Sequence, residues 1–291
     1  HMRCNNSFVY DLFQALYKSS LTCPNCRRQS NTFDPFLSVS LPIPQRTRRP
    51  IYVTVVYLDA HPKQVKIGLL MNQSDTIHDL RCTLASDTKI PTSQLILTEV
   101  DSEGFQRTFH DEEPLGDLQE SELYAIETPA PLGETETTTP PSPSNPGQFQ
   151  TQFLTLLVIN KLVTNAKGKR FGAPIVLQVP RDITYLDLQK DILHNMVHML
   201  REGIIAQQLG VVFKLRVVEG LPEKCYLPYD VEHPLYMPTI DKALTANTAD
   251  RGPAHVKLIS EWDQQTKQCM VNTVEDNVEE HDSVQQVDMA Y

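Results

Sequence analysis

The residues of this chain whose types and spacing most clearly suggest chemistry are two cysteines three positions apart. Cys23 and Cys26 enclose Pro24 and Asn25, and a Cys-x-x-Cys turn can direct two thiolates at one Zn²⁺ ion. A structural zinc site takes four ligands, and the sequence holds no second Cys-x-x-Cys and no histidine pair at zinc-finger spacing. The pair therefore predicts half of a zinc site. A redox pair and a chance coincidence are the alternatives, although no thioredoxin-like pattern precedes it.

No other group of residues completes a catalytic site in the sequence. Nucleophilic catalysis needs a Cys or Ser beside a positioned His and an orienting acid or amide. Cys4 has no patterned segment before it, and His194 and His198 lack the glutamate of a His-Glu-x-x-His motif. We therefore expect these two histidines to lie on a partly exposed helix face. The glycines within 168–172 lack the spacing of a phosphate-binding loop.

Composition and charge exclude several classes of protein. The chain has 291 residues and a net charge of −10, which opposes binding to a nucleic-acid backbone. No apolar run is long enough to cross a membrane, and no secretion leader is recognisable. The six cysteines include one close pair, a usage typical of reducing compartments. We therefore expect a cytoplasmic or nuclear protein with no membrane and no nucleic-acid partner.

The cysteine pair has to be positioned by the segment 3–50. Apolar residues within 8–17 fall at helical or mixed spacing before the pair. After it, residues 36–41 alternate apolar and polar side chains, which predicts a half-buried strand that Pro42 ends.

Residues 51–127 predict a compact unit with the element order β-β-α-β-β-β. Strands are expected at 51–57, 63–71, 95–100, 105–109 and 123–126, where β-branched and aromatic residues gather. Thr76 and Asp79 have the spacing of a capping box, which predicts a helix start. One mixed sheet packed on one helix buries this pattern, so the fold class is α+β.

The remaining chain divides by composition into three parts. Residues 128–150 are rich in Pro and Thr and predict an extended linker, with phosphorylation or docking at its Ser/Thr-Pro steps as the alternative. Residues 151–263 predict a second sheet-and-helix unit of similar element order, possessing a helix whose apolar stripe runs from Leu188 to Leu200. Residues 264–291 are acidic and predict a flexible tail.

Four stretches in the first part of the chain carry a resemblance to a known family. They read Ser-Phe-Val-Tyr-Asp-Leu-Phe-Gln (7–14), Ser-Ser-Leu-Thr-Cys-Pro-Asn-Cys (19–26), Ser-Asn-Thr-Phe-Asp-Pro-Phe-Leu (30–37) and Leu-Pro-Ile-Pro (41–44). Together they resemble the fingers region of a ubiquitin-specific protease. The resemblance implies that Cys23 and Cys26 supply half of a structural four-cysteine zinc site, which a later Cys-x-x-Cys completes in the family.

The resemblance extends to the rest of the chain at lower specificity. Some family members carry an insertion between the two zinc halves that begins with a ubiquitin-like domain, and residues 51–127, with their β-grasp order, match that placement. Phe171-Gly172-x-Pro174 resembles a later part of such insertions. Ubiquitin and ubiquitinated proteins are then the implied partners. The aromatic candidates for contact with ubiquitin are Phe13, Tyr17, Phe33 and Phe36.

The family's catalytic boxes, of the types Gly-Asn-Thr-Cys and Gly-His-Tyr, are absent from this sequence. We therefore expect a middle segment of a cysteine-type deubiquitinase that is inactive alone, although the whole enzyme hydrolyses ubiquitin–protein isopeptide bonds. A non-catalytic adaptor, with partners on the ubiquitin-like unit, is the alternative. A zinc-ribbon nucleic-acid binder is disfavoured by the negative charge. Competition of the ubiquitin-like unit for the ubiquitin site is a further hypothesis.

Overall fold

The chain forms two compact units, residues 1–46 and residues 47–291. The computed structural model describes residues 12, 14–36, 48–59, 61–118, 122–130, 153–164, 167–204, 210–248, 251–271 and 278–290. Helices and mixed sheets together confirm the predicted α+β class. Among the described residues, no helix is long and apolar enough to cross a membrane.

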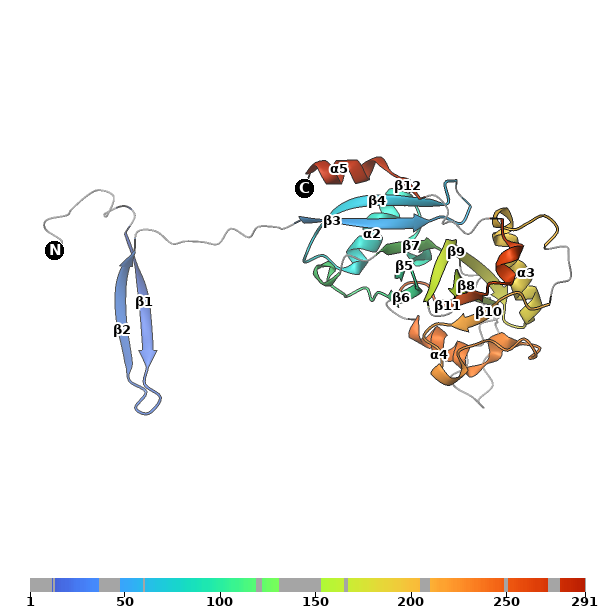
Figure 1. Cartoon of the computed structure of the whole chain (residues 1–291). Coiled ribbons are helices and arrows are strands. Elements are labelled where there is room, and N and C mark those ends of the chain that lie inside the picture. The colour runs from blue at the N-terminus through green and yellow to red at the C-terminus, as the bar shows by residue number, and fades with distance from the viewer. Residues whose placement is uncertain are drawn as a thin grey trace, which may run out of the picture. The chain divides into compact units, whose positions relative to one another are not determined.

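The described part of the first unit contains a two-stranded antiparallel hairpin (Figure 1). Its strands are β1 (Ala15–Thr22) and β2 (Gln29–Phe36), and the last pair before the turn is Thr22 with Gln29. Residues 15–17, the end of the segment predicted to have helical or mixed spacing, therefore belong to a strand. Tyr and Thr side chains, as in β1, favour strands. The strand predicted at 36–41 overlaps β2 only at Phe36, and residues 37–41 lie outside the described residues.

The second unit begins with the predicted β-β-α-β-β-β order. Its strands are β3 (Arg48–Val56), β4 (Gln64–Asn72), β5 (Leu95–Asp101), β6 (Gly104–Thr108) and β7 (Leu123–Glu127), and its helix is α2 (Ile77–Thr88). Since β3 starts at Arg48, residues 48–50 belong to this sheet and not to the preceding segment. The strand order is β4-β3-β7-β5-β6, with β3 and β7 parallel at the centre.

The sheet holds α2 against one face because alternate residues of the strands are apolar. Ile51, Val53 and Val55 of β3 point to this face and are buried with Leu80 and Leu84 of α2. The predicted capping box forms as expected from the sequence, since Thr76 accepts from the N–H of Asp79, whose carboxylate accepts from the N–H of Thr76.

A second mixed sheet follows in the order β10-β11-β8-β9. Its strands are β8 (Phe153–Thr164), β9 (Lys167–Pro180), β10 (Lys214–Val217) and β11 (Val256–Trp262), with β8 and β11 parallel and the other pairs antiparallel. Two helices accompany it, α3 (Tyr185–Asn195) and α4 (Pro238–Ala246), of which α4 was not predicted from the sequence. Short 3₁₀ turns lie at Thr92–Gln94, Leu115–Asp117, Val197–Met199, Pro222–Lys224, Pro234–Tyr236 and Thr266–Cys269.

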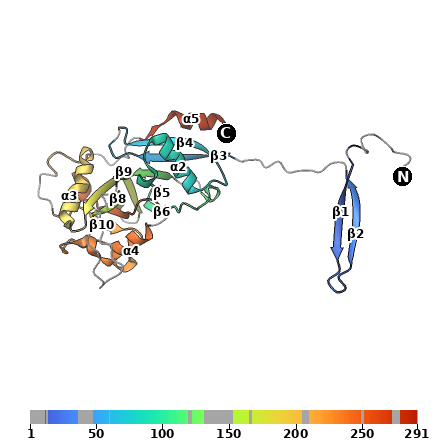
Figure 2. The ribbon, with the colours of Figure 1, turned by 180° about the vertical axis from the view of Figure 1, so that it is seen from behind.

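The two sheets pack together through the faces that point away from their own helices. Ile96, Tyr124 and Ile126 of the first sheet meet Leu157 and Ile159 of the second in one buried apolar cluster. Figure 2 shows the strands of both sheets side by side from behind. The segment 128–150, predicted as a linker, therefore joins parts of one compact unit, and its residues 131–150 lie outside the described residues.

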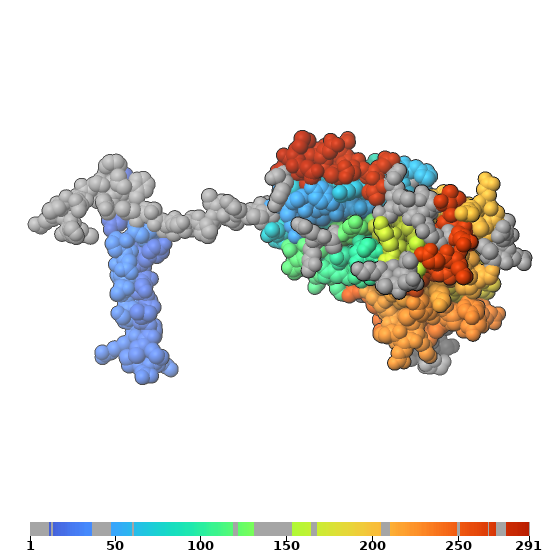
Figure 3. All heavy atoms as spheres, viewed as in Figure 1, coloured from blue at the N-terminus to red at the C-terminus, as the bar shows by residue number. Residues whose placement is uncertain are grey.

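The segment 264–291 is not a wholly flexible tail, which corrects the prediction. Strand β12 (Glu279–Glu280) pairs with β4, and helix α5 (Asp282–Ala290) lies along β3 and β4 (Figure 3). Gly68 of β4 faces α5, whereas its neighbours Ile67 and Leu69 pack with α2, so the two helices lie on opposite faces. Val284 and Val287, one helical turn apart, are buried there. This apolar pair outweighs the local negative charge in deciding the structure of the segment.

Candidate functional site

The Cys-x-x-Cys pair lies in the turn at the tip of the hairpin. The N–H of Cys23 donates to the carbonyl of Arg28 at 2.9 Å, and the N–H of Arg27 donates to the carbonyl of Cys23 at 2.9 Å. Arg27 has a left-handed φ of 54°, which closes the turn. Both cysteines are exposed free thiols. The sequence therefore folds into a tight, solvent-facing knuckle that displays both sulfurs.

The backbone of this turn suits a thiolate. The N–H of Cys26, then that of Asn25 and the Cys26 side chain, hydrogen-bond to the Cys23 sulfur and lower the pKa of its thiol. A metal binds the thiolate and not the thiol, so this donor arrangement fits a zinc ligand. Among the described residues, no group of three or more His, Cys, Asp or Glu side chains can hold a metal ion. Within them, no third candidate ligand accompanies the pair.

The aromatic candidates divide between the two faces of the hairpin. The Tyr17 and Phe36 rings stack with centroids 4.0 Å apart, and the register places both side chains on one face. Phe33 lies opposite Lys18 in the ladder and therefore points to the other face. Tyr17 and Phe33 are exposed, and Phe13 lies outside the described residues. The structure thus brings together two of the four candidates.

The two histidines on the predicted helix do not share a helix face. Helix α3 ends at Asn195, so His194 occupies its last turn and His198 lies in the following 3₁₀ turn. The ring of His194 contacts the carbonyl of Lys190 through Nδ1 at 2.8 Å. The apolar stripe predicts a helix that continues to Leu200. Instead, α3 ends at Asn195, and the chain continues through the buried Met196 into a 3₁₀ turn, which does not keep the helical spacing.

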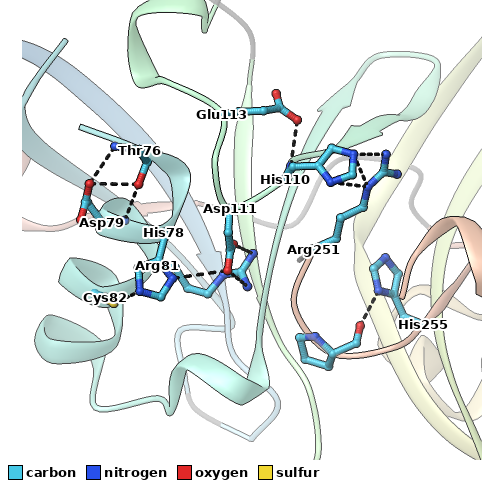
Figure 4. A network of polar contacts seen from close by, with 11 residues as sticks. Thr76, His78, Asp79, Arg81, Cys82, His110, Asp111, Glu113, Arg251 and His255 are labelled. Carbon is cyan, nitrogen blue, oxygen red and sulfur yellow. Dashed lines mark hydrogen bonds and ion pairs between the residues drawn. The ribbon is translucent and has the colours of Figure 1, made fainter. Parts of the chain in front are cut away.

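A second cluster of reactive side chains lies on α2 and the loop that follows β6 (Figure 4). The sulfur of Cys82 is 3.5 Å from Nε2 of His78, and Nδ1 of the same ring is 3.3 Å from a carboxylate oxygen of Asp111. Arg81, which is 4% exposed, pairs with the other oxygen of Asp111 at 2.9 Å. This cluster was not predicted from the sequence. The i, i+4 spacing of His78 and Cys82 is the signal that could have found half of it.

A buried polar network joins the two sheets nearby. The ammonium of Lys257, which is 0% exposed, donates to Thr108 at 3.1 Å and pairs with Glu219 at 2.9 Å. Burial raises the pKa of Glu219, but the charge of Lys257 and the hydrogen bonds from Lys257 and Asn247 together outweigh burial and lower the pKa overall. His255 is buried beside this pair, and burial lowers its pKa to about 4. The network is a desolvated ionic contact inside the unit.

Arg251 extends this network to the first sheet. Its Nε donates to Nε2 of His110 at 3.0 Å (Figure 4), and its Nη1 donates to the carbonyl of Ala246 at 2.9 Å. His110 precedes Asp111 in the loop after β6. The loop that carries the second cluster is therefore held from both sheets.

Comparison with known proteins finds relatives over nearly the whole chain. Human ubiquitin carboxyl-terminal hydrolase 31 is 38% identical over 313 residues, which cover 96% of this chain and 23% of that protein. Mouse ubiquitin carboxyl-terminal hydrolase 43 is 36% identical and covers 96% of this chain and 26% of that protein. Ubiquitin carboxyl-terminal hydrolase 15 of Xenopus tropicalis is 30% identical over 68% of this chain and 19% of that protein.

These alignments cover only part of each relative. The chain spans about a quarter of the length of the first relatives it matches. No protein-family model matches the chain.

Proposed function

The chain belongs to the family of ubiquitin carboxyl-terminal hydrolases, the ubiquitin-specific proteases, and from this premise we propose that it is a middle segment of an active deubiquitinase. The whole protein would hydrolyse isopeptide bonds between ubiquitin and other proteins through a catalytic cysteine and histidine supplied by other parts of the enzyme. The observation that carries the proposal is the sequence identity across both units, 38% over 96% of the chain. This segment would contribute the ubiquitin grip and a regulatory or partner-binding surface.

The hairpin is the part that we assign to ubiquitin contact. An isolated pair of strands is marginally stable in water, and Leu16, Tyr17 and Phe33 are each more than half exposed. Such apolar exposure is typical of a surface that a partner or a neighbouring strand covers. The stacked rings of Tyr17 and Phe36 form a continuous aromatic surface on one face of the hairpin, and we place ubiquitin there.

Zinc is the cofactor that we propose for the hairpin tip. Cys23 and Cys26 would hold it, together with two ligands from elsewhere in the whole protein. When bound, the ion would fix the tip by coordination and would take no part in the chemistry of hydrolysis. The support is the donor set described above, in which backbone N–H groups favour the thiolate of Cys23.

The unit 47–291 is the proposed regulatory part. Its first sheet has the strand order and the central parallel pair of a ubiquitin-like β-grasp, and its second sheet repeats the core order β9-β8-β11-β10. The face of the first sheet opposite α2 is covered by the second sheet and by α5. Competition with ubiquitin through that sheet face is therefore disfavoured, and partners would use the remaining surface. Cytoplasm or nucleus is the proposed location.

A fluorogenic ubiquitin substrate tests the function directly. We expect turnover by the full-length protein and none by residues 1–291 alone. Silence of the full-length protein would move the assignment to a non-catalytic adaptor. Activity of the 291-residue chain would contradict the proposal that the catalytic residues lie elsewhere.

Metal analysis tests the zinc site separately. We expect the isolated chain to carry well under one zinc ion per molecule, and the full-length protein to lose zinc when Cys23→Ser and Cys26→Ser are combined. Cys225→Ser is the matched control, since Cys225 lies outside the hairpin and should leave the zinc content unchanged. A full zinc complement in the double variant would refute the assignment of these ligands.

A further inference from the structure

The cluster on α2 has a geometry that the proposed function does not use. Cys82 is an exposed thiol, and the side chain of His78 is 59% exposed beside it. Nε2 of His78 faces the sulfur at 3.5 Å, while Nδ1 faces Asp111 at 3.3 Å (Figure 4). The three groups therefore stand in the order thiol, imidazole, carboxylate, which is the order in which a base and its orienting acid activate a nucleophile.

The carboxylate end of this row is fixed by the fold. Asp111 pairs with the buried guanidinium of Arg81 at 2.9 Å, and the N–H of His78 donates to the backbone carbonyl of Asp111 at 3.0 Å. Asp79, the other acid next to His78, is occupied by the capping box with Thr76. Asp111 is thus the acid that orients the imidazole. Its position depends on the loop after β6, which Arg251 contacts through His110.

The same geometry argues against a metal site at this place. Asp111 contacts Nδ1 of His78 and Cys82 contacts Nε2, so the sulfur and the carboxylate lie at different nitrogens of the ring. One ion cannot bind the thiolate, the imidazole and the carboxylate together in this arrangement. Accordingly, no metal-binding group of three such side chains occurs among the residues that the structure describes.

We propose that Cys82 is a reactive thiol that hydroperoxides oxidise, with His78 as its general base and Asp111 as the positioning residue. The sulfur forms a bond to one peroxide oxygen as the oxygen–oxygen bond breaks. The thiol proton passes to Nε2 of His78 and from there to the departing oxygen, so hydrogen peroxide leaves one molecule of water. The sulfur becomes a sulfenic acid, oxidised by two electrons that reduce the peroxide.

The class of oxidant follows from the openness of the site. Cys82 lies on an exposed helix face, where a small reactant can reach the sulfur without a binding pocket. The proposal is independent of the proposed function, because a chain that never contacts ubiquitin would carry the same three side chains.

The test compares the rate at which Cys82 is oxidised in the folded chain with its rate in the unfolded chain. The 291-residue protein is treated with hydrogen peroxide in buffer and in urea, and sulfenic acid is trapped with dimedone. Trypsin cuts after Arg81 and Lys89 and releases residues 82–89, which mass spectrometry quantifies. Folding alone can only shield a thiol. A folded rate above the unfolded rate therefore requires assistance by neighbouring groups.

We expect the folded chain to oxidise Cys82 several-fold faster than the unfolded chain, because a neighbouring base raises the thiolate character of the sulfur. His78→Asn should remove the acceleration, and Asp111→Asn should reduce it. His194→Asn is the matched control, an exposed histidine in the last turn of another helix, and should leave the rate unchanged. Because His78 is exposed, its replacement should not unfold the chain, and circular dichroism checks this. A folded rate at or below the unfolded rate, or one unaffected by His78→Asn, overturns the proposal.

Discussion

Acidification should destabilise the unit 47–291 through one histidine. His255 is 0% exposed, its Nδ1 contacts the carbonyl of Pro253 at 2.8 Å, and burial lowers its pKa from 6.5 to about 4. The unfolded chain therefore binds a proton at His255 at a higher pH than the folded chain does. The contribution of the neutral His255 to the free energy of unfolding is fully present above pH 6.5. It is lost progressively as the pH falls toward about 4.

The size of this loss follows from the two pKa values. With 6.5 unfolded and about 4 folded, the free energy of unfolding should fall by about 2 kcal/mol between pH 7 and pH 5 and by about 3 kcal/mol at pH 4. Glu219 has a lowered pKa as well, but its contribution is lost only below its ordinary value of 4.5. A comparison at pH 5 therefore isolates the histidine.

Urea unfolding at pH 7, 6, 5 and 4 measures the effect, with His255→Leu as the variant that cannot titrate. The difference in unfolding free energy between the original chain and the variant should change by the amounts given above. His233→Leu is a suitable control, because its ring is partly exposed. If the variant and the original chain lose stability in parallel from pH 7 to pH 5, the burial argument for His255 is refuted.

Three further changes test the packing. Glu219→Gln leaves the buried charge of Lys257 unpaired and should cost about 3 kcal/mol in urea unfolding at pH 7, whereas equal stability would mean that the pair contributes nothing. Gly68→Val places a side chain against α5, because even a Cβ added at this position would lie 3.0 Å from the carbonyl oxygen of Ser283. Amide hydrogen exchange in α5 should therefore accelerate, while α2 keeps its protection. Leu84→Ala opens a cavity between α2 and the sheet and should lower the free energy of unfolding by about 2–5 kcal/mol; a loss below 1 kcal/mol would contradict the described core.

The strands of both sheets were predictable because their burial alternates along the sequence. Val53 and Val55 illustrate this, since alternate apolar residues of β3 point to α2. The capping pair at Thr76 was also predictable, because its two hydrogen bonds are local. By contrast, α4 begins at Pro238 without a side-chain cap and has a short apolar stripe, so no strong local signal marked it.

The candidate sites were predictable to different extents. The Cys-x-x-Cys turn is a local pattern, so the sequence located Cys23 and Cys26, and the hairpin then set their exposure. The oxidation site on α2 depends on Asp111, which the fold brings from 33 positions beyond His78. Sequence spacing carries no information on such a contact. The division of the aromatic side chains between two hairpin faces likewise required the register of the ladder.

The apolar contact between the two sheets changes what the segment 128–150 contributes energetically. Ala130 and Phe153, the described residues on either side of 131–152, belong to one compact unit, so the two sheets fix the separation of these two positions. The length of the segment between them then enters stability only through loop closure, at about 0.6 kcal/mol for each doubling. A change in the number of residues between these two positions should therefore alter the free energy of unfolding only slightly.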